Sequence, residues 1–481
     1  MDKLIEFLRK FPLLRKIAAL PALSRPYHYL MGFLGALWYW FPSHHLTIIG
    51  ITGTKGKTTT STMVWHILRE SGYVAGLATT VNFRIGDREL INERKQTMLG
   101  RFALQKLLRQ MVNEGCTHAV LETSSWGIAQ YRHRFVKYDI AAFTNITPEH
   151  IEQHGGFEAY RTAKVRLFEH VGQSEKGIGA YNLDDKNVTA FLGPRMPIRY
   201  GYALNANGAN RLAQTISSFK EIIYVSGIDL KKDKNTFRVG GVKFSLPLPG
   251  EFNVQNAACA ISVARSLDIP LEQIAKALST MPPVAGRMEV LQARNKPTVI
   301  IDYAHEPASL EAIYRAAQTY HPKKVIGVLG SQGGGRDIWK REAMGRIAAK
   351  YLNTVILTNE DPYDDDPLQI MDDIEKGIVK SSRGGAAPEI YKIVDRKEAL
   401  RKAISMATKD DVVIATGKGG EVWMCIANER KIPWNEREAV EDVLNEKSRA
   451  EKSGGLLHGG RVREIRGYKK GKPRSGEATG L

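Results

Sequence analysis

Cysteine is scarce in this chain, which has three cysteines in 481 residues. Cys116, Cys259 and Cys425 are widely spaced and fit neither a CxxC pair nor a Cys/His metal-ligand spacing. This scarcity excludes a disulfide-stapled secreted scaffold and a cysteine-based zinc module. We expect three reduced core thiols in a cytoplasmic protein.

Long hydrophobic runs are also lacking, and no signal peptide is recognisable. An aromatic-rich apolar run, Tyr27–Phe41, lies between Pro26 and Pro42. It is too short for a bilayer-spanning helix, which needs about 20 residues. Two interpretations stay open: a helix that packs on the next domain, or an interfacial membrane helix assisted by the basic residues from Arg9 to Lys16. Packing is favoured because the run has little polar face, and any membrane association would be weak.

Acidic residues are in deficit, with 51 against 69 Lys and Arg, and the net charge is +18. Part of the excess lies at the two ends of the chain. Residues 1–45 carry six Lys/Arg against two acids, and residues 447–481 carry ten against three. Basic tails can touch nucleic acid or anionic lipid, but this composition is more typical of a solvated, disordered end, so we expect no nucleic-acid partner.

Strand-like and helix-like stretches alternate along the chain. The apolar, β-branched residues 46–51 predict a buried strand, and helical spacing predicts a helix over Lys57–Ser71. Similar patterns predict strands at Ala119–Glu122, Ile140–Thr144, Val299–Asp302, Val325–Leu329, Thr354–Leu357 and Val412–Ala415, and helices at Arg101–Gly115, Glu158–His170 and Glu342–Lys350. The alternation is typical of parallel sheets with helices on both faces, an α/β class. Residues 237–246 predict an antiparallel hairpin.

Composition divides the chain into four segments. We predict a short helical N-terminal segment over residues 1–45, a central domain over 46–283, a C-terminal α/β domain over 284–446, and a basic disordered tail over 447–481. The stretch 279–287, rich in Pro and Gly, is a natural linker between the two domains.

A glycine-rich turn, Gly53–Thr58 (GTKGKT), lies directly between the first predicted strand and its helix. Glycines let the backbone wrap a phosphate chain, and the helix N-terminus offers it free N–H groups. Lys57 adds a mobile positive charge, and the hydroxyl of Thr58 suits Mg²⁺. The spacing is tighter than the usual phosphate-binding loop, because Gly50 lies one residue too far back. In this context the turn predicts a site for ATP or GTP.

Three other positions carry polar groups of interest. Glu122 closes an apolar strand and fits a Mg²⁺ ligand, whereas Thr123–Ser125 beside it fit a helix N-cap, and both interpretations stay open. His150 and His154 stand four apart, but adjacent glycines and the lack of cysteines disfavour zinc. Lys164 lies in an apolar helical pattern, which by itself predicts a lysine that reaches outward from the core.

The order of these segments resembles the Mur ligase family, most closely its UDP-N-acetylmuramyl-tripeptide synthetase branch. The matching segments are GTKGKTTT (53–60), ETSSWGIAQYR (122–132), TNITPEHIEQHG (144–155), AYRTAKVRLF (159–168), PGEFNVQNAACA (249–260), AGRME (285–289), DYAHEPASL (302–310), GGRDIWKREAMG (334–345), TNEDPYDDDP (358–367) and ATGKGGE (415–421). Ten segments in family order are far more specific than any one of them. The resemblance implies a central P-loop ATPase domain with a parallel sheet and a Rossmann-like C-terminal domain.

The resemblance also implies an ATP site with two Mg²⁺ ions. Lys57 and Thr58 would hold the phosphates and the first Mg²⁺, with Glu122 as a further ligand, and His150 would hold the second ion. Lys164 matches the lysine that the family carbamylates with CO₂ into a metal ligand, which requires a neutral, partly buried amine. The rest of the implied ATP site is Gly53, Thr54, Lys55, Gly56, Thr59, Asn253, Asn256, Arg287 and Asp302.

The remaining implied positions bind the two molecules that are joined. Those for a muramyl-peptide acceptor are Thr123, Ser124, Gln130 and Arg132. Those for the incoming amino acid are Arg341, Glu360, Asp361, Tyr363, Gly417 and Glu421. The implied reaction is the ATP-dependent, ADP-forming addition of an amino acid to a UDP-N-acetylmuramyl dipeptide in peptidoglycan precursor synthesis, through an acyl phosphate. We expect a monomer.

This sequence departs from the family pattern at three places. Residues 1–45 are shorter than the family's UDP-binding domain, so we expect that domain to be truncated. Tyr363 replaces an arginine that pairs with the distal carboxylate of meso-diaminopimelate, and Asp364–Asp366 beside it would favour a distal ammonium, as in a diamino acid such as lysine. Glu149 stands where aspartate is usual.

Two rival functions remain open. A Mur-type ligase with another acceptor, such as a folylpolyglutamate synthase, would keep the same chemistry. A non-catalytic ATP-binding module would keep only the nucleotide site.

Overall fold

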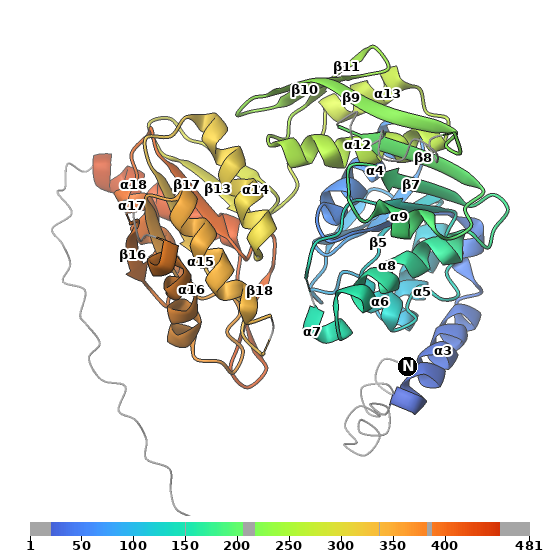
Figure 1. Cartoon of the computed structure of the whole chain (residues 1–481), viewed down its shortest axis with the longest axis horizontal. Helices are drawn as coiled ribbons and strands as arrows, with labels where there is room; N and C mark the ends of the chain where they lie inside the picture. Colours follow the sequence, from blue (N-terminus) through green and yellow to red (C-terminus); the bar gives the residue numbers. More distant parts are fainter. Residues whose placement is uncertain (1–20, 150, 205–216, 336, 382–386, 453–481) are drawn as a thin grey trace, which may run out of the picture.

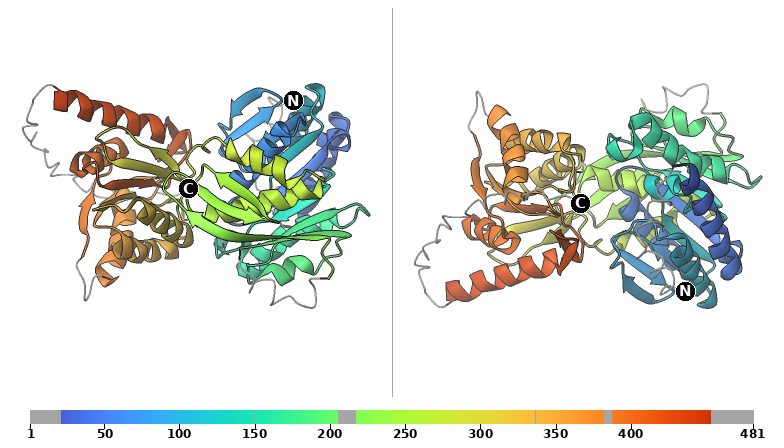
Figure 2. Two further views of the ribbon diagram at one scale, coloured as in Figure 1. Left: turned by 90° about the horizontal axis from the view of Figure 1, so that it is seen from above. Right: turned by 90° about the horizontal axis from the view of Figure 1, so that it is seen from below.

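The computed structural model describes residues 21–149, 151–204, 217–335, 337–381 and 387–452, and these form two α/β lobes side by side (Figure 1). Helix α3 (Pro21–Trp38) lies on the side of the first lobe that faces away from the second lobe (Figures 1 and 2). All three cysteines are buried and free, as predicted.

The first lobe is built on an eleven-stranded sheet with the order β11-β10-β9-β8-β7-β6-β1-β5-β2-β3-β4. Neighbouring strands from β9 to β2 in this order are parallel, and antiparallel strands extend both edges. The strands are β1 (Thr47–Thr52), β2 (Ala75–Ala78), β3 (Asn82–Ile85), β4 (Arg88–Ile91), β5 (His118–Glu122), β6 (Ile140–Phe143), β7 (Ile178–Asn182), β8 (Ile198–Ala203), β9 (Glu221–Leu230), β10 (Asn235–Val239) and β11 (Val242–Leu246).

Helices cover both faces of this sheet. They are α4 (Lys57–Glu70), α5 (Arg101–Asn113), α6 (Ser125–Ala129), α7 (Ile151–His154), α8 (Phe157–Val171), α9 (Val188–Leu192), α12 (Glu251–Ser266) and α13 (Leu271–Ser279), with the 3-10 turn η1 (Pro42–His45). Successive β1 side chains point to opposite faces, so Ile49 and Ile51 join the core under α4 and α12 while Ile48 joins the core under α5 and α8. The buried β1 therefore holds the phosphate-binding turn in a rigid frame.

The second lobe has a six-stranded sheet with the order β12-β13-β17-β14-β15-β16, in which β12 alone is antiparallel to its neighbour. Its strands are β12 (Glu289–Leu291), β13 (Thr298–Asp302), β14 (Val325–Leu329), β15 (Thr354–Leu357), β16 (Glu389–Lys392) and β17 (Val412–Thr416), beside the small pair β18 (Trp423–Ile426) and β19 (Arg430–Pro433). Its helices are α14 (Pro307–Ala317), η2 (Gln318–Tyr320), α15 (Trp339–Tyr351), α16 (Pro367–Ser381), α17 (Arg396–Met406) and α18 (Glu436–Lys452).

The α/β class and the predicted strands are confirmed, with strand boundaries that agree or differ by one residue. The predicted hairpin is also present, and β9 extends it to three antiparallel strands. The prediction that ordered structure ends at Glu446 is wrong, because α18 continues to Lys452. Residues 453–481 lie outside the described part of the chain, and the domain boundary at 283/284 stays a prediction.

Helix α3 begins earlier than the apolar run predicted, and Pro26 lies inside it. One face of α3 packs on α5, as the packing interpretation requires, while several large apolar side chains of α3 remain exposed. No helix in the described ranges is long and apolar enough to cross a membrane.

Candidate active site

The turn between β1 and α4 has the geometry of a phosphate cradle. Gly53 and Gly56 have φ angles of 152° and 79°, in the region that favours glycine. A Cβ at Gly56 would lie 2.1 Å from Oδ1 of Asn256, so the turn and α12 approach too closely for any side chain there. Asn145, which follows β6, accepts a hydrogen bond from the Lys55 amide and donates one to the Lys55 carbonyl. These contacts fix the turn from two neighbouring elements.

Two lysine ammonium groups lie against carbonyl oxygens of this turn. Lys57 donates to the carbonyl of Thr54 at 2.8 Å, and Lys164, on α8, donates to that of Gly53 at 2.6 Å. Lys164 is 2% exposed, and its nitrogen lies 4.5 Å from the ring centre of Tyr160. Burial, and then the nearby Lys57 charge, hold the pKa of Lys164 well below its usual range. The prediction that Lys164 reaches outward is therefore wrong.

Glu122, at the end of β5, gathers three donors on one oxygen. Thr58 donates its hydroxyl at 3.0 Å, and Thr80 donates both its amide and its hydroxyl. Glu122 is 4% exposed. The hydroxyl and the carboxylate are hard oxygen ligands at the edge of the phosphate turn, and Mg²⁺ prefers a few such ligands together with phosphate. Glu122 and Thr58 therefore fit one Mg²⁺ ion.

The second lobe closes on the turn through charged side chains. Lys55 pairs with Glu149 at 2.9 Å and with Glu306 of the second lobe at 3.3 Å. His305 of the second lobe lies 3.1 Å from the same Glu149 carboxylate. Burial lowers the pKa of Lys55, but the two carboxylates outweigh it and raise that pKa above its usual value. His150 lies outside the described residues.

His154 does not form a metal cluster with its neighbours. Its Nε2 lies 3.1 Å from the hydroxyl of Ser125, and its ring meets those of Trp126 and Tyr160 edge-on. Within the described ranges, no group of three or more His, Cys, Asp and Glu side chains could hold a metal ion by itself.

A cavity of about 310 Å³ extends from the phosphate turn into the space between the lobes. Its polar lining includes Asn256 and Asp302, and Arg287 lies over the ring of Tyr303 at 4.4 Å. Asp302 accepts hydrogen bonds from the amides of Met288 and Ala304, while burial raises its pKa. The apolar lining residues include Phe252, Ala308, Ala312 and Ile313. A phosphate cradle, an apolar wall and a carboxylate suit a nucleoside triphosphate.

The two lobes correspond to two known domains. Residues 51–264 match the Mur ligase middle domain, and residues 286–419 match the Mur ligase glutamate ligase domain. The chain belongs to the Mur ligase family. Mur ligases are ATP-dependent ligases that form amide bonds, and this chain is an enzyme of that kind.

Relatives of this Mur ligase include the UDP-N-acetylmuramyl-tripeptide synthetase of Roseiflexus sp., which is 35% identical over 86% of this chain and 81% of its own length. The UDP-N-acetylmuramoyl-L-alanyl-D-glutamate–2,6-diaminopimelate ligase of Caldanaerobacter subterraneus is 36% identical, with coverages of 86% and 82%. A solved diaminopimelate ligase structure matches with a TM-score of 0.56 and 28% identity over 84% of this chain and 79% of its own. The ADP-bound folylpolyglutamate synthase of Mycobacterium tuberculosis matches at 0.59 with 15% identity over 81% and 91%, and it shares the fold.

Of the residues predicted to bind the muramyl-peptide acceptor, all of which the structure describes, only Gln130 and Arg132 contact each other through their side chains. Arg132 donates to the side chain of Gln130 through two nitrogens and also to the carbonyl of Met98. Ser124 caps α6 by accepting from the Gly127 amide, which agrees with the N-cap interpretation. Thr123 is wholly buried and donates to a carbonyl within β5, and its role as an acceptor-binding side chain stays a prediction.

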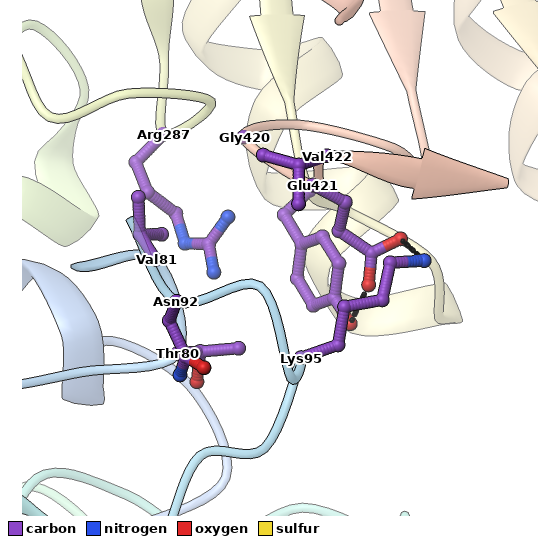
Figure 3. Close-up of a pocket in the computed structure, with 9 residues that line it drawn as sticks. Thr80, Val81, Asn92, Lys95, Arg287, Gly420, Glu421 and Val422 are labelled. Carbon is purple, nitrogen blue, oxygen red and sulfur yellow. Dashed lines mark hydrogen bonds and ion pairs between the residues drawn. The ribbon is translucent and has the colours of Figure 1, made fainter. Parts of the chain in front are cut away.

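A network of ionic groups joins the lobes where the incoming amino acid is expected. Lys95, from the loop between β4 and α5, lies 3.2 Å from Asp361 and 2.8 Å from Glu421 of the second lobe. Lys418, with no exposed surface, pairs with the same two carboxylates. Figure 3 shows Lys95 and Glu421 in contact, with Arg287 facing them from the other side of a pocket of about 10 Å³, room for about one water molecule.

The acidic residues after Tyr363 all have partners within the chain. Asp364 accepts from the Asn428 amide, and Asp366 accepts from the first turn of α16. Asp365 pairs with Arg341, whose side chain is 4% exposed and also pairs with Asp373. The role of Asp364–Asp366 in binding a distal ammonium therefore stays a prediction, although each carboxylate already accepts a hydrogen bond or pairs with Arg341.

Glu360 and Gly417 lie against each other beneath this network. A Cβ at Gly417, whose φ is 100°, would lie 2.5 Å from a Glu360 carboxylate oxygen. Both oxygens of Glu360 are buried and have no hydrogen-bond partner in the described part of the chain, and burial raises the pKa of this carboxyl. Tyr363 takes a left-handed φ of 51°.

Sequence reasoning missed several polar residues of the site, among them Thr80 and Glu306, which contact Glu122 and Lys55. Lys418, Asn145 and His305 lie inside quoted motifs, so their motif membership was an available signal. Lys95 lies in no motif and is identified only through the contact between the lobes.

Proposed function

We propose that this Mur ligase adds a diamino acid to a UDP-N-acetylmuramyl dipeptide in the cytoplasm. The names of its relatives support this acceptor, because they are tripeptide synthetases and diaminopimelate ligases. The proposal of a diamino acid rests on the carboxylates of Asp361 and Glu421, which both pair with the Lys95 ammonium. A substrate ammonium that displaced Lys95 would meet the same two carboxylates.

The residues of this chain would support activation of the acceptor carboxylate. A carboxylate oxygen attacks the γ-phosphorus, the bond to the ADP oxygen breaks, and an acyl phosphate forms. The incoming amine then attacks the acyl carbon, loses a proton and expels phosphate. Lys57 and the Gly53–Thr58 amides would hold the triphosphate, and Lys55 would keep the two lobes closed so that water is excluded. Bound Mg²⁺ at Thr58 and Glu122 would offset the charge that gathers on the phosphates.

We also propose that Lys164 is carbamylated. A neutral amine is required for reaction with CO₂, and burial favours the neutral form of this lysine. The test is a ¹³C NMR spectrum of the protein in ¹³C-bicarbonate, in which a carbamate signal should be present and should vanish in Lys164→Arg. A spectrum identical for both proteins contradicts the proposal.

The function is tested by ADP release with a panel of acceptors and amino acids. With UDP-N-acetylmuramyl dipeptide, lysine, ornithine and diaminopimelate should raise turnover well above alanine and glutamate. Turnover with a folate acceptor, as for the folylpolyglutamate synthase fold relative, or with monoamino acids alone would overturn the proposal. Lys95→Gln should lower the KM for the diamino acid, because its ammonium competes for the same carboxylates, while Lys276→Gln on the remote α13 should leave that KM unchanged.

A further inference from the structure

Helix α3 exposes most of its large apolar side chains to solvent, and of these Tyr29 and Phe33 also contact the ring of Phe135. Its inner face is made of small residues, Gly32, Gly35 and Ala36, all buried. A Cβ at Gly35 would lie 3.4 Å from the Phe102 backbone, so α3 lies directly against α5. An ordinary surface helix packs its large apolar residues inward, and α3 is the reverse.

The outer face of α3 and its C-terminal turn form a contiguous aromatic surface. The residues of this surface are between 38% and 79% exposed. They are Tyr27, Tyr29, Leu30, Phe33, Leu34, Leu37, Trp38 and Trp40. Trp40, the most exposed, and Phe41 both have left-handed φ angles, of 56° and 47°. Arg109 of α5 holds this strained turn by donating to the carbonyls of Tyr39 and Trp40. The fold thus keeps an unfavourable turn that displays an indole, and soluble surfaces rarely carry so large an apolar patch.

The charged side chains of α3 and α5 are all basic. Neither α3 nor α5 contains an acidic residue, whereas together they carry Arg25, Arg101, Lys106 and Arg109. Residues 1–20, which precede α3 in the sequence, add five Lys/Arg against two acids. The surface therefore complements an anionic partner.

A basic cleft of about 320 Å³ adjoins the aromatic surface. Arg134 and Arg166 line it together with Glu169 and two histidines, His133 and His170. The cleft and α3 are continuous, because Arg134 lies 5.9 Å from the ring centre of Tyr29. The Nε of Arg134 and the Nδ1 of His133 are buried without a hydrogen-bond partner among the described residues. The cleft can therefore bind a phosphate through the guanidinium groups of Arg134 and Arg166, which line it.

We propose that the α3 surface docks this enzyme on an anionic phospholipid bilayer. The aromatic side chains enter the headgroup layer with α3 lying parallel to the membrane, and Arg134 and Arg166 bind lipid phosphate. Tyrosine and tryptophan favour this layer because their rings have an apolar body and a polar edge. The active-site cavity lies between the lobes, away from α3, so docking leaves it open (Figure 1). The proposal is independent of which amino acid is added.

The test is flotation of the full-length protein with vesicles of phosphatidylcholine containing phosphatidylglycerol. The protein should float with these vesicles, weakly with pure phosphatidylcholine, and less in high salt. Trp38→Ser with Trp40→Ser, and separately Arg134→Glu with Arg166→Glu, should each lower the bound fraction about tenfold. The matched control is Val379→Ser with Lys276→Glu, an exposed apolar and an exposed basic residue far from α3, and it should float as the wild type does. ADP release in solution should be unchanged in all variants, which shows that they fold.

Three outcomes overturn the proposal. The first is equal flotation of wild type and both double variants. The second is binding of inorganic phosphate in the cleft, removed by the arginine substitutions, with no flotation. The third is a wild-type dimer by light scattering that the tryptophan variants convert to a monomer without changing flotation, which would make the α3 surface a protein interface.

Discussion

The side-chain nitrogen of Lys164 lies 2.6 Å from the carbonyl oxygen of Gly53. This contact joins the middle of α8 to the first residue of the phosphate-binding turn. It also places a titratable amine, 2% exposed, among Lys57, Lys55, Glu149 and Glu122, the other charged groups that act on its pKa. The amine is therefore held where its charge state affects both the fold and the bound phosphates.

The low pKa of Lys164 predicts a pH dependence of stability. Between the folded pKa and the usual lysine value, the unfolded chain binds more protons than the folded protein does, so the contribution of Lys164 to the free energy of unfolding rises with pH. We expect the difference in this free energy between wild type and Lys164→Met to increase from neutral to mildly alkaline pH. Urea denaturation at several pH values measures it. A difference that stays flat or falls, or an equal slope for the exposed Lys276→Met, contradicts the prediction.

The sequence predicted the elements well where one physical signal dominates. The buried strand before Gly53 and the helix after it follow from an apolar run and helical spacing, and both form within a residue of their predicted limits. The predicted ends of α3 and α18 were wrong, because tertiary packing and not local composition sets these helix limits. Pro26 marked the start of an apolar run but lies within α3, and Glu446 marked a change of composition but α18 continues past it.

The residues of the site that the sequence predicted lie in the family motifs. Glu122 and Lys164 lie at the phosphate turn, where the motif order placed them. Thr123 turns into the core because alternate residues of a strand and its end face opposite sides. The acids after Tyr363 are adjacent in sequence but serve a turn, a helix N-terminus and Arg341. The Asp364 and Asp365 contacts depend on tertiary structure and have no local signature, whereas the Asp366 contact is local to the start of α16.

Removal of the negative charge at Glu122 should lower the affinity of the enzyme for Mg²⁺. Glu122→Gln keeps the shape of the side chain, and Thr58→Val removes the hydroxyl that lies 3.0 Å from it. Each should raise the Mg²⁺ concentration for half-maximal ADP release by about tenfold, because Glu122→Gln replaces a charged ligand with a neutral amide oxygen and Thr58→Val removes a hydroxyl ligand. Glu114→Gln, an exposed residue that pairs with Arg88 at the surface, is the control. An unchanged Mg²⁺ dependence in both variants would remove these residues from the metal site.

Alanine substitutions at two glycines, one at each end of α4, can distinguish the effect of backbone strain from the effect of a steric clash. Gly56 and Gly72 have φ angles of 79° and 88°, so alanine at either position costs about 1 kcal/mol of stability. Only at Gly56 would the new Cβ meet another atom, Oδ1 of Asn256 at 2.1 Å, whereas nothing lies within 4 Å at Gly72. We expect Gly56→Ala to lower ATP affinity more than tenfold and Gly72→Ala to leave it unchanged, by titration calorimetry. Equal affinities would show that the turn tolerates displacement of α12.

The buried ion pair of Arg396 and Glu436 predicts a large loss of stability in the second lobe. Neither side chain is exposed, and Arg396 also donates to the carbonyls of Thr416 and Asn359. Arg396→Met leaves the Glu436 charge buried without its partner, and we expect a cost of about 3–5 kcal/mol. Glu436→Gln added to Arg396→Met should recover part of this cost, because it removes the unpaired charge.

Chemical denaturation of this lobe, followed by the fluorescence of Trp434, measures the cost, since the Trp434 indole donates to Glu436 at 2.6 Å. The control is Arg346→Met, which breaks a half-exposed pair with Glu342 on α15 and should cost under about 1 kcal/mol. If the two single variants lose equal stability, burial contributes nothing to the strength of the Arg396 pair. If the double variant is less stable than Arg396→Met, the unpaired charge of Glu436 is not what destabilises the lobe.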